Sequence, residues 1–571
     1  PTATIDTTGF AAGSVHKIEV SAADPANNTI TASLNLGIQD ATNLNGPSAE
    51  IVTPALDAEI TAPTQIIGTI TTAGLLEYTL SYAPKGTATF TPFATGTTAV
   101  TNGTLGTLDP TLLKNGVYIV RLAAVDTNGR SFWTETTYRV TGDMKVGNFT
   151  VTFTDLSVPV TGLPVTVSRT YDSRDKTSKD FGIGWTVDIQ NVKLDENRTP
   201  GDGWPQTKTG GAFGSYCING DTEHYVSVNL PDGRTEEFDV TLNPNCQRMS
   251  PVEQTQITYT PRPGTTSTLV LKDSKLLLVA GGLLIDPDTV EPYDPTGYLL
   301  TDKDGTVYEL DQAFGIRMAK DANGNTLTYG KDGVTHSAGT GVRFVRDAKG
   351  RIVEIIGPDG SKIRYSYNSK GDLSTVTDAA GNVTNYKYNR SHGLTEIKDP
   401  RGITPVKNEY DDSGRLMTHT DSYGKRIEYT HDIAGRQEVV KDRNGNLTVY
   451  IYDEKGRVLQ KTDPLGNVTS FTYDAVGNKL SETDPLGNTT AWTYDTKKNV
   501  LSETRTINGQ VITTSHTYNS LNKVLTTTDP LGHVTTNTYD AKGNLLTTTD
   551  AIGNTTTNTY DLKGNLKTTT D

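Results

Sequence analysis

The 571-residue chain carries 52 basic and 66 acidic side chains, for a formal net charge of −14. This balance argues against a nucleic acid or an anionic membrane as the main partner, because both require basic patches. Hydrophobic residues make up only 34% of the chain, and no run reaches the roughly 18 apolar residues of a membrane-spanning helix. Glycine and threonine interrupt nearly every window that could hold a long helix, so the sequence predicts an all-β fold.

The first segment, residues 1–46, resembles the end of a β-sandwich domain. The pattern predicts a strand over 14–21, a turn over 22–28 and a second strand over 29–36. We interpret this hairpin as the C-terminal part of an upstream immunoglobulin-like domain.

Residues 47–142 are typical of a complete sandwich, because Pro, Gly, Asn and Asp bound short strands at the spacing of that class. The Cys…Trp…Cys signature of antibody-type domains is absent, so we expect an immunoglobulin/fibronectin-like domain. The expected strands are 51–52, 65–71, 76–83, 90–95, 117–126 and 131–140.

A different pattern begins at Asp143 and includes an irregular stretch, 194–265, that is rich in Gly, Pro and Asn. This stretch could cap one end of the following repeats or form an inserted strand pair, and the sequence leaves both open. It holds the only two cysteines, Cys217 and Cys246. We favour a disulfide formed in an oxidising compartment over two buried thiols; closing this loop would contribute about 3–4 kcal/mol.

The C-terminal part of the chain, 321–571, is an array of short repeats. A Tyr-Asp pair or a close variant returns every 21 residues through most of it, with His431-Asp432 and Arg346-Asp347 in two positions that lack the tyrosine. A fixed period of this kind indicates one supersecondary unit stacked many times.

Each repeat is predicted to be a β-hairpin with two kinds of turn. In both, an aspartate caps the backbone two residues on and a glycine accepts the left-handed conformation three residues on. An aromatic residue two positions before the tyrosine, such as Phe471 before Tyr473, places two rings on one face, where they stack on neighbouring strands. The structural residues expected in the central repeats are Tyr452, Asp453, Gly456, Asp463, Gly466, Tyr473, Asp474, Gly477, Asp484, Gly487, Tyr494 and Asp495.

These repeats resemble those of the YD-repeat (Rhs) family of large secreted and cell-surface proteins. The resemblance is carried by 473–478 and 483–488, and upstream by 159–171 and 180–185, which resemble the segment that opens the repeat shell in bacterial members. Two further stretches, 301–308 and 333–346, are similar to degenerate early repeats. The resemblance covers 145–571.

The resemblance implies a spiralling β-sheet that closes as a hollow shell. It divides this part of the chain into a shell-opening region with an insertion and degenerate repeats, 143–320, and the repeats of 321–571. In bacterial members the shell often encloses a C-terminal toxic domain, whereas animal relatives use it for adhesion. Because the chain stops at Asp571 in mid-repeat, we expect it to be part of a longer protein.

No constellation in the sequence predicts a catalytic, cofactor-binding or metal-binding residue. The eight histidines form no His-x-His or His-Glu-x-x-His motif, and no nucleophile elbow or phosphate loop occurs. Asp321-Ala322-Asn323-Gly324-Asn325 is the most tempting calcium signal, but its glycine is fourth where an EF-hand loop needs it sixth. The recurrent aspartates are explained by turn capping.

The leading hypothesis is therefore a non-catalytic scaffold, the encapsulating shell of a secreted bacterial polymorphic toxin, located outside the cell or on its surface. Its expected partner is its own C-terminal effector domain, with no nucleic acid and no membrane insertion in this segment. The alternative is a cell-surface adhesin or extracellular structural protein whose partner is a receptor or a glycan stacked on the aromatic ladder.

Overall fold

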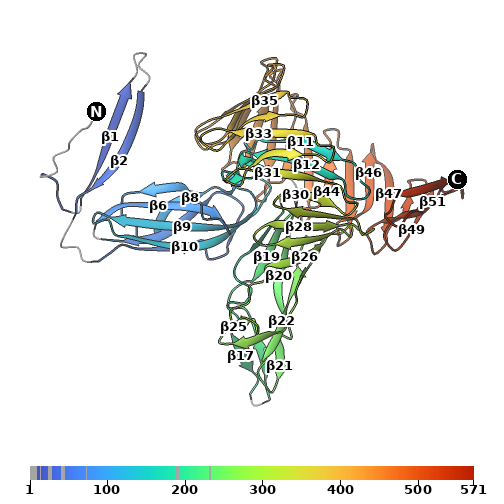
Figure 1. Ribbon diagram of the computed structural model, residues 1–571, viewed down its shortest axis with the longest axis horizontal. Helices are drawn as coiled ribbons and strands as arrows, with labels where there is room; N and C mark the ends of the chain where they lie inside the picture. Colours follow the sequence, from blue (N-terminus) through green and yellow to red (C-terminus); the bar gives the residue numbers. More distant parts are fainter. Residues whose placement is uncertain are drawn as a thin grey trace. The chain divides into compact units, whose positions relative to one another are not determined.

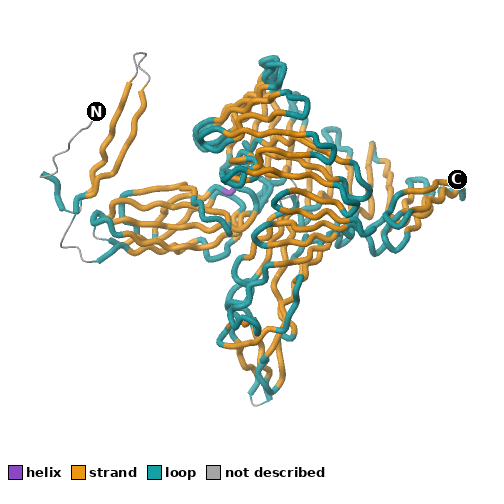
Figure 2. Tube along the Cα trace, viewed as in Figure 1, coloured by secondary structure: helices purple, strands orange, loops and turns teal. Residues whose placement is uncertain are grey.

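The computed structural model describes residues 9–12, 14–23, 29–39, 45–72, 74–187, 192–211, 213–230 and 233–571. The prediction of an all-β fold is confirmed: within these ranges the only helix is a 3₁₀ turn, η1 (Pro110–Leu112), and nearly all other regular structure is strand (Figure 2). The chain divides into two compact units, Pro1–Met144 and Lys145–Asp571.

The first unit holds an antiparallel strand pair and a two-sheet sandwich. The pair is β1 (Val15–Ala23) with β2 (Thr29–Gly37), and most of the predicted turn between them lies outside the described residues. One sheet of the sandwich has the order β3-β5-β8 and the other β4-β10-β9-β6-β7. Their bounds are β3 (Ser48–Thr53), β4 (Glu59–Ile60), β5 (Thr64–Thr71), β6 (Leu75–Pro84), β7 (Thr91–Gly96), β8 (Gly103–Leu108), β9 (Gly116–Asp126) and β10 (Ser131–Val140).

The sandwich contains strands β4 and β8, which the sequence pattern does not predict. Strand β8 reads as a loop because it contains Gly103 and Gly106. The structure gives a packing reason for the second glycine: a Cβ on Gly106 would lie 2.5 Å from the Cβ of Ala94. Buried residues of both sheets, including Ile66, Leu80 and Val120, form one core.

The second unit opens with two small sheets. One has the order β11-β12-β15, and the other pairs β13 with β14. Their bounds are β11 (Thr150–Val158), β12 (Val165–Asp172), β13 (Ser178–Lys179), β14 (Gly182–Ile183) and β15 (Trp185–Val187).

The stretch 194–265, which the sequence leaves undecided, supplies most strands of two further sheets, drawn mostly in green in Figure 1, and is richer in strands than an inserted pair. A six-stranded sheet has the order β16-β19-β20-β22-β24-β25, and a three-stranded sheet the order β17-β18-β21. Their bounds are β16 (Lys193–Glu196), β17 (Gln206–Thr209), β18 (Ser215–Ile218), β19 (Tyr225–Asn229), β20 (Thr235–Asn243), β21 (Cys246–Arg248), β22 (Gln254–Pro261), β24 (Leu277–Ala280) and β25 (Leu283–Ile285).

The rest of the second unit is one antiparallel sheet of 28 strands, in which β23 pairs with β26 and every later strand pairs with the next in sequence (Figure 1). The early strands are β23 (Thr268–Leu271), β26 (Gly297–Thr301), β27 (Val307–Asp311), β28 (Gly315–Lys320), β29 (Thr326–Gly330), β30 (Gly333–His336), β31 (Gly341–Arg346), β32 (Ile352–Ile356), β33 (Lys362–Tyr367), β34 (Leu373–Thr377), β35 (Val383–Tyr388), β36 (Leu394–Lys398), β37 (Val406–Tyr410) and β38 (Leu416–Thr420). The late strands are β39 (Arg426–Asp432), β40 (Gln437–Lys441), β41 (Leu447–Tyr452), β42 (Val458–Thr462), β43 (Val468–Tyr473), β44 (Lys479–Thr483), β45 (Thr489–Tyr494), β46 (Val500–Ile507), β47 (Gln510–Tyr518), β48 (Val524–Thr528), β49 (Val534–Tyr539), β50 (Leu545–Thr549), β51 (Thr555–Tyr560) and β52 (Leu566–Thr570).

The early part of this sheet is covered on one face. The six-stranded sheet packs on β23 and β26–β28 through a core that contains Phe238 and Tyr298. The sheet β11-β12-β15 packs on the following strands through a second core that contains Trp185, Tyr365 and Ile397. The apolar side chains that lead into the repeats are therefore covered by earlier segments of the same chain.

Candidate functional site: a repeated wall and the seam between its windings

Most turns of the late sheet are built on one aspartate. In the turn after β42, Asp463 Oδ1 accepts the amide hydrogens of Leu465 and Asn467, both at 2.9 Å, and Oδ2 accepts a hydrogen bond from Asn467 Nδ2. Gly466 has a φ of 85°, which glycine adopts without the clash of a Cβ. The Asn467 side chain and the backbone amides stabilise the carboxylate and lower the pKa of Asp463.

The other aspartates expected to cap turns make the same contacts. Each accepts the amide hydrogens of the second and fourth residues after it, and the associated glycines have positive φ. These aspartates are Asp453, Asp474, Asp484 and Asp495, and the glycines are Gly456, Gly477 and Gly487.

The tyrosine of each pair ties its repeat to the preceding one. The Tyr473 hydroxyl donates to the carbonyl oxygen of Val458 at 3.0 Å, and the Tyr494 hydroxyl to that of Lys479 at 2.9 Å, in each case 15 residues back. Burial raises the pKa of Tyr494, which keeps its hydroxyl protonated as a donor. The sequence pattern predicts only ring packing for these tyrosines. It does not predict their hydrogen bond, for which the constant spacing is the only signal in the sequence.

The hairpin of β39 and β40 departs from this rule. The Tyr452 hydroxyl donates to Glu438 Oε2 at 3.0 Å, a side chain rather than a carbonyl. In the position that lacks tyrosine, His431 Nε2 lies 2.9 Å from the carbonyl oxygen of Leu416, again 15 residues back. Burial alone would lower the pKa of His431, but the Glu438 carboxylate and the Leu416 carbonyl outweigh it and raise the pKa. His431 therefore replaces tyrosine as a donor.

We define the ring face as the face of the large sheet that bears the aromatic residue two positions before each tyrosine. In the early repeats its cross-strand pairs are Tyr365 with Val376 and Tyr386 with Ile397, and all four residues are buried.

The same pair of positions becomes polar in the late repeats. Phe471 lies opposite Glu482, and Trp492 donates its indole N–H to Glu503 Oε2 at 3.1 Å. Two repeats later the pair is Asn537 with Thr548, joined by a 2.9 Å hydrogen bond. Among the described residues no earlier segment packs a core on this part of the ring face.

The opposite face of the late sheet is lined by hydroxyl groups. Cross-strand pairs join side-chain oxygens at 2.6–2.7 Å, and these side chains are exposed to solvent. The pairs are Thr472 with Ser481, Thr493 with Ser502, Thr517 with Thr526, Thr538 with Thr547 and Thr559 with Thr568.

A buried ion pair fixes the sheet β11-β12-β15 on the ring face. Arg169 Nε lies 2.7 Å from Asp155 Oδ2, and these side chains are 3% and 6% exposed. The Tyr365 hydroxyl donates to the same carboxylate at 2.7 Å, and Arg169 Nη2 donates to the Tyr386 hydroxyl at 3.0 Å. The Trp185 indole N–H donates to the Tyr388 hydroxyl at 2.8 Å, so ring-face tyrosines hold the covering sheet.

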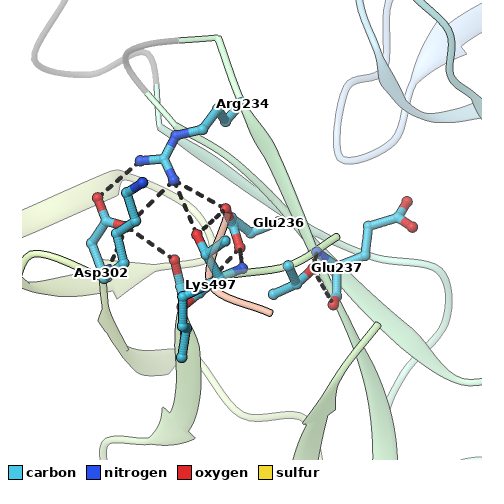
Figure 3. A network of polar contacts seen from close by, with 9 residues as sticks. Arg234, Glu236, Glu237, Asp302 and Lys497 are labelled. Carbon is cyan, nitrogen blue, oxygen red and sulfur yellow. Dashed lines mark hydrogen bonds and ion pairs between the residues drawn. The ribbon is translucent and has the colours of Figure 1, made fainter. Parts of the chain in front are cut away.

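The late repeats also contact the early part of the same sheet, along what we call the seam. Figure 3 shows its first contact, where Glu236, 2% exposed, accepts hydrogen bonds from the amides of Thr266 and Ser267. Arg234 bridges Glu236 and Asp302, at 3.2 and 2.9 Å. Lys497 Nζ reaches this network from the late sheet and donates to the carbonyl oxygen of Thr266 at 3.0 Å, across 231 residues.

Amide side chains continue the seam. Asn522 Nδ2 donates to the carbonyl oxygen of Lys303 at 2.6 Å, across 219 residues. Asn323 and Asn544 exchange two side-chain hydrogen bonds, at 3.1 and 3.0 Å, across 221 residues. Asn325 Nδ2 donates to the carbonyl oxygen of Lys563 at 3.0 Å. The turn after β26 thus meets the turn after β47, and the turn after β28 meets the turn after β49, so one winding of the sheet takes 21 strands.

The seam joins two different edges of the sheet. Successive hairpin turns lie alternately on two edges, because neighbouring strands are antiparallel. The Tyr-Asp turns at 495–499, 519–523, 540–544 and 561–565 form one edge, which we call the Tyr-Asp edge. The turns at 302–306 and 321–325 lie on the opposite edge, together with the later turns at 463–467 and 484–488.

The predicted disulfide is present. Cys217 and Cys246 are bonded and lie opposite each other in the sheet β17-β18-β21. It holds β18 and β21 together at a point where the chain between them folds into another sheet.

The described ranges contain no group of three or more His, Cys, Asp or Glu side chains that could hold a metal ion. Asp321, in the most calcium-like segment, accepts the amide hydrogen of Asn325 at 2.8 Å and its Nδ2 at 2.7 Å, as the other turn aspartates do. Within the same ranges no helix is long and apolar enough to span a membrane.

Two family models match the chain. The RHS repeat matches 367–404, 410–448, 452–489 and 539–571. A domain of unknown function, DUF6531, matches 143–198, the segment that includes β11–β15. No curated protein matches the chain.

The solved structures with detectable similarity include toxin complexes. The crystal structure of TcdB2-TccC3-TEV matches with 13% identity and a TM-score of 0.36, over 78% of this chain and 26% of that one. The Tc holotoxin pore of Photorhabdus luminescens matches with 13% identity and a TM-score of 0.30, over 79% and 26%. TcdB2-TccC3 without its hypervariable C-terminal region gives 13% and 0.27, over 88% and 26%. The chain spans about a quarter of the length of these proteins.

Proposed function

We propose that this chain, an RHS-repeat protein, is the wall of a hollow container: a non-catalytic scaffold of a large secreted, toxin-like bacterial protein that acts outside the cell or on its surface. The observation that carries the proposal is the seam. Contacts between residues 219 to 238 positions apart bring the sheet back onto itself. A sheet that returns to its own edge surrounds a space.

The character of the ring face supports its assignment as the inner surface of the container. Where earlier segments cover it, the residues opposite the rings are Val376 and Ile397. Where no such cover lies among the described residues, the same positions hold Glu482, Glu503 and Thr548. A wall of this composition can face water or a loosely held cargo, because its polar groups need no apolar partner.

A structural role for the repeated residues supports the non-catalytic part of the proposal. The turn carboxylates are engaged by backbone amides, and the tyrosine hydroxyls by backbone carbonyls. The polar groups of the Tyr-Asp residues are therefore used in contacts within the sheet. No observation favours the binding of a glycan to the aromatic side chains. We propose that the partner is a cargo inside the wall, such as an effector domain of the same protein, and that the first unit serves as a spacer or attachment module.

Size-selective labelling tests the container. Thr548 lies on the ring face and Thr547 beside it on the opposite face, and each makes one side-chain hydrogen bond across the sheet. Single Thr548→Cys and Thr547→Cys variants introduce the only free thiol, because the native cysteines are bonded to each other. We expect a small maleimide to label both at similar rates and a polymer-linked maleimide to label position 548 much more slowly. Equal rates with the large reagent would reject an enclosed ring face.

A further inference from the structure

The three-stranded sheet that holds the disulfide ends in two exposed apolar side chains. Phe213 is 77% exposed and Met249 is 67% exposed. Beyond the paired part of β18 and β21, the Met249 amide donates to the carbonyl oxygen of Gly214, the residue after Phe213, at 3.0 Å. The two side chains therefore start from neighbouring points of the backbone, and we call them the apex pair. In Figure 1, β17 and β21 lie at the far end of the green projection from the 28-stranded sheet.

Met249 holds a backbone conformation that is costly for its residue type. Its φ of 70° lies in the left-handed region, which residues with a bulky side chain rarely adopt and glycine adopts freely. The side chain is mostly exposed, so packing does not offset this cost. A strained residue that presents an apolar side chain to solvent indicates a functional surface.

The charges around the apex pair are all positive. The segments 206–218 and 246–252 form the apex and the strands that carry it, and their only charged residues are Lys208 and Arg248. Lys208 Nζ lies 5.3 Å from the centre of the Tyr216 ring, and Arg248 directly precedes Met249. This local excess of cations occurs in a chain whose net charge is −14.

Exposed leucines elsewhere in the second unit have the opposite electrostatic setting. Leu465 and Leu486 are 86% and 87% exposed. Their amides donate to the carboxylates of Asp463 and Asp484, so each leucine lies in a turn that carries a negative charge. An anionic surface would therefore attract the apex pair and repel these turns. The apex pair is distinguished by its charge as well as by its exposure.

We propose that the apex pair inserts into the interface of a membrane that contains anionic phospholipids, with Lys208 and Arg248 contacting the lipid headgroups. Apolar burial and the attraction of cations to anionic lipids act together in such interfacial binding. Side chains that project from the end of a hairpin enter a bilayer without a matching pocket, whereas a protein partner would have to supply one. The net charge of the whole chain opposes wider adsorption, so the contact is confined to the apex. It requires neither a membrane-spanning segment nor a cargo inside the wall.

Co-sedimentation of the full chain with lipid vesicles tests the proposal. We expect the wild type to bind vesicles of equimolar phosphatidylserine and phosphatidylcholine, and to bind phosphatidylcholine vesicles more weakly. High salt should reduce this difference, because it screens the headgroup charges. The variant Phe213→Asp with Met249→Asp should lower the partition coefficient about tenfold or more, because it removes both apolar groups and adds two negative charges. Aspartate tolerates the left-handed conformation of residue 249, so this variant keeps the backbone.

The matched control is Leu465→Asp with Leu486→Asp, the same change at two side chains more exposed than the apex pair, and it should leave the partition coefficient unchanged. Lys208→Gln with Arg248→Gln should bind both kinds of vesicle equally. An intact disulfide, and hence no thiol that reacts with a maleimide, establishes that the apex of each variant is folded. The proposal is overturned by an equal loss in the control. It is also overturned by a wild type that binds neither vesicle, the result expected if the apex docks on a protein.

Quenching by brominated lipids locates the contact. Phe213→Trp places an indole at the apex, and Leu486→Trp places one in an exposed turn of the large sheet. On the mixed vesicles we expect strong quenching of the added indole at position 213 and none at position 486, each measured relative to the wild type. Equal quenching, or stronger quenching at position 486, would overturn the assignment of the apex as the membrane contact.

Discussion

The early and late parts of the large sheet share the antiparallel pairing of neighbouring strands and recurring turns that begin with Asp or Asn, yet they differ on the ring face. From β26 to β37 this face is covered by the six-stranded sheet and by β11-β12-β15. From β39 to β52 no earlier segment packs a core on it within the described ranges. The residues opposite the rings change accordingly, from Val376 and Ile397 to Glu482 and Glu503.

This difference distinguishes the contacts that form the sheet from the residues that depend on a covering segment. Hairpin turns and tyrosine–carbonyl hydrogen bonds are present in both parts, for example at Tyr367 and Tyr539, so they suffice to propagate the sheet. Apolar residues on the ring face occur where another part of the chain lies against it. The residue opposite each ring therefore indicates whether another segment of the chain covers that part of the sheet.

The largest expected effect comes from placing a charge at this position in the two parts. Ile397 is 2% exposed, so Ile397→Asp buries an unpaired carboxylate and should lower the free energy of unfolding by about 4 kcal/mol or more. Thr548→Asp introduces the same charge at the equivalent late position, where the side chain is partly exposed and makes one hydrogen bond, to Asn537, and should cost only about 1 kcal/mol. Urea denaturation of the two variants measures the difference, and similar losses would remove the distinction between covered and bare wall.

The buried ion pair gives a second, smaller test of the covered part. Arg169→Leu leaves the Asp155 carboxylate buried without its cation and should cost about 3–5 kcal/mol. Replacing both residues by leucine should recover much of this loss, because no uncompensated charge remains. A double-mutant cycle, with the free energy of unfolding measured by denaturation, tests this recovery. If the double variant is less stable than Arg169→Leu alone, the hydrogen bonds of the network stabilise the fold beyond the compensation of charge.

Turn glycines should behave alike in both parts. Gly381 and Gly487 have φ of 87° and 83°, and a Cβ on either would meet no atom within 4 Å. Each Gly→Ala substitution therefore carries only the conformational cost of a left-handed residue, about 1 kcal/mol. Thermal unfolding of the two variants should show equal losses. A much larger loss at Gly381 would mean that the covering sheet also constrains the turns.

The sequence predicts the repeated wall well because its turns are local. Asp463 and Gly466 lie within one turn, and each acts through atoms at most a few residues away. The disulfide was predictable because the chain holds only two cysteines. The strand pattern of the stretch 194–265 was not fully predictable, since several of its strands, such as β17 and β18, have only four residues, too few to show a period of two.

The seam and the tyrosine hydrogen bonds also escaped prediction. Asn323 and Asn544 are 221 residues apart, and neither differs from an ordinary turn asparagine in sequence. Only the curvature accumulated over a whole winding brings them together. The ring-face change from Val376 to Glu482 was visible in the sequence, but it becomes informative only once the covering segments are known.

The smallest expected effect is a pH dependence at the border between covered and bare wall. His431 faces Glu438 at 3.1 Å and stacks on Tyr429, and Arg415 opposes its protonation. Its pKa is raised in the folded state, so its contribution to stability is full below the unfolded pKa near 6.5 and is lost as pH rises through the folded pKa. His431→Tyr restores the residue found in the other repeats and removes this titration. We therefore expect the wild type to lose more stability than His431→Tyr between about pH 6 and 8. Denaturation at each pH measures the free energy of unfolding of both proteins. If this free energy changes equally with pH in the two proteins, the His431–Glu438 contact does not favour the charged ring.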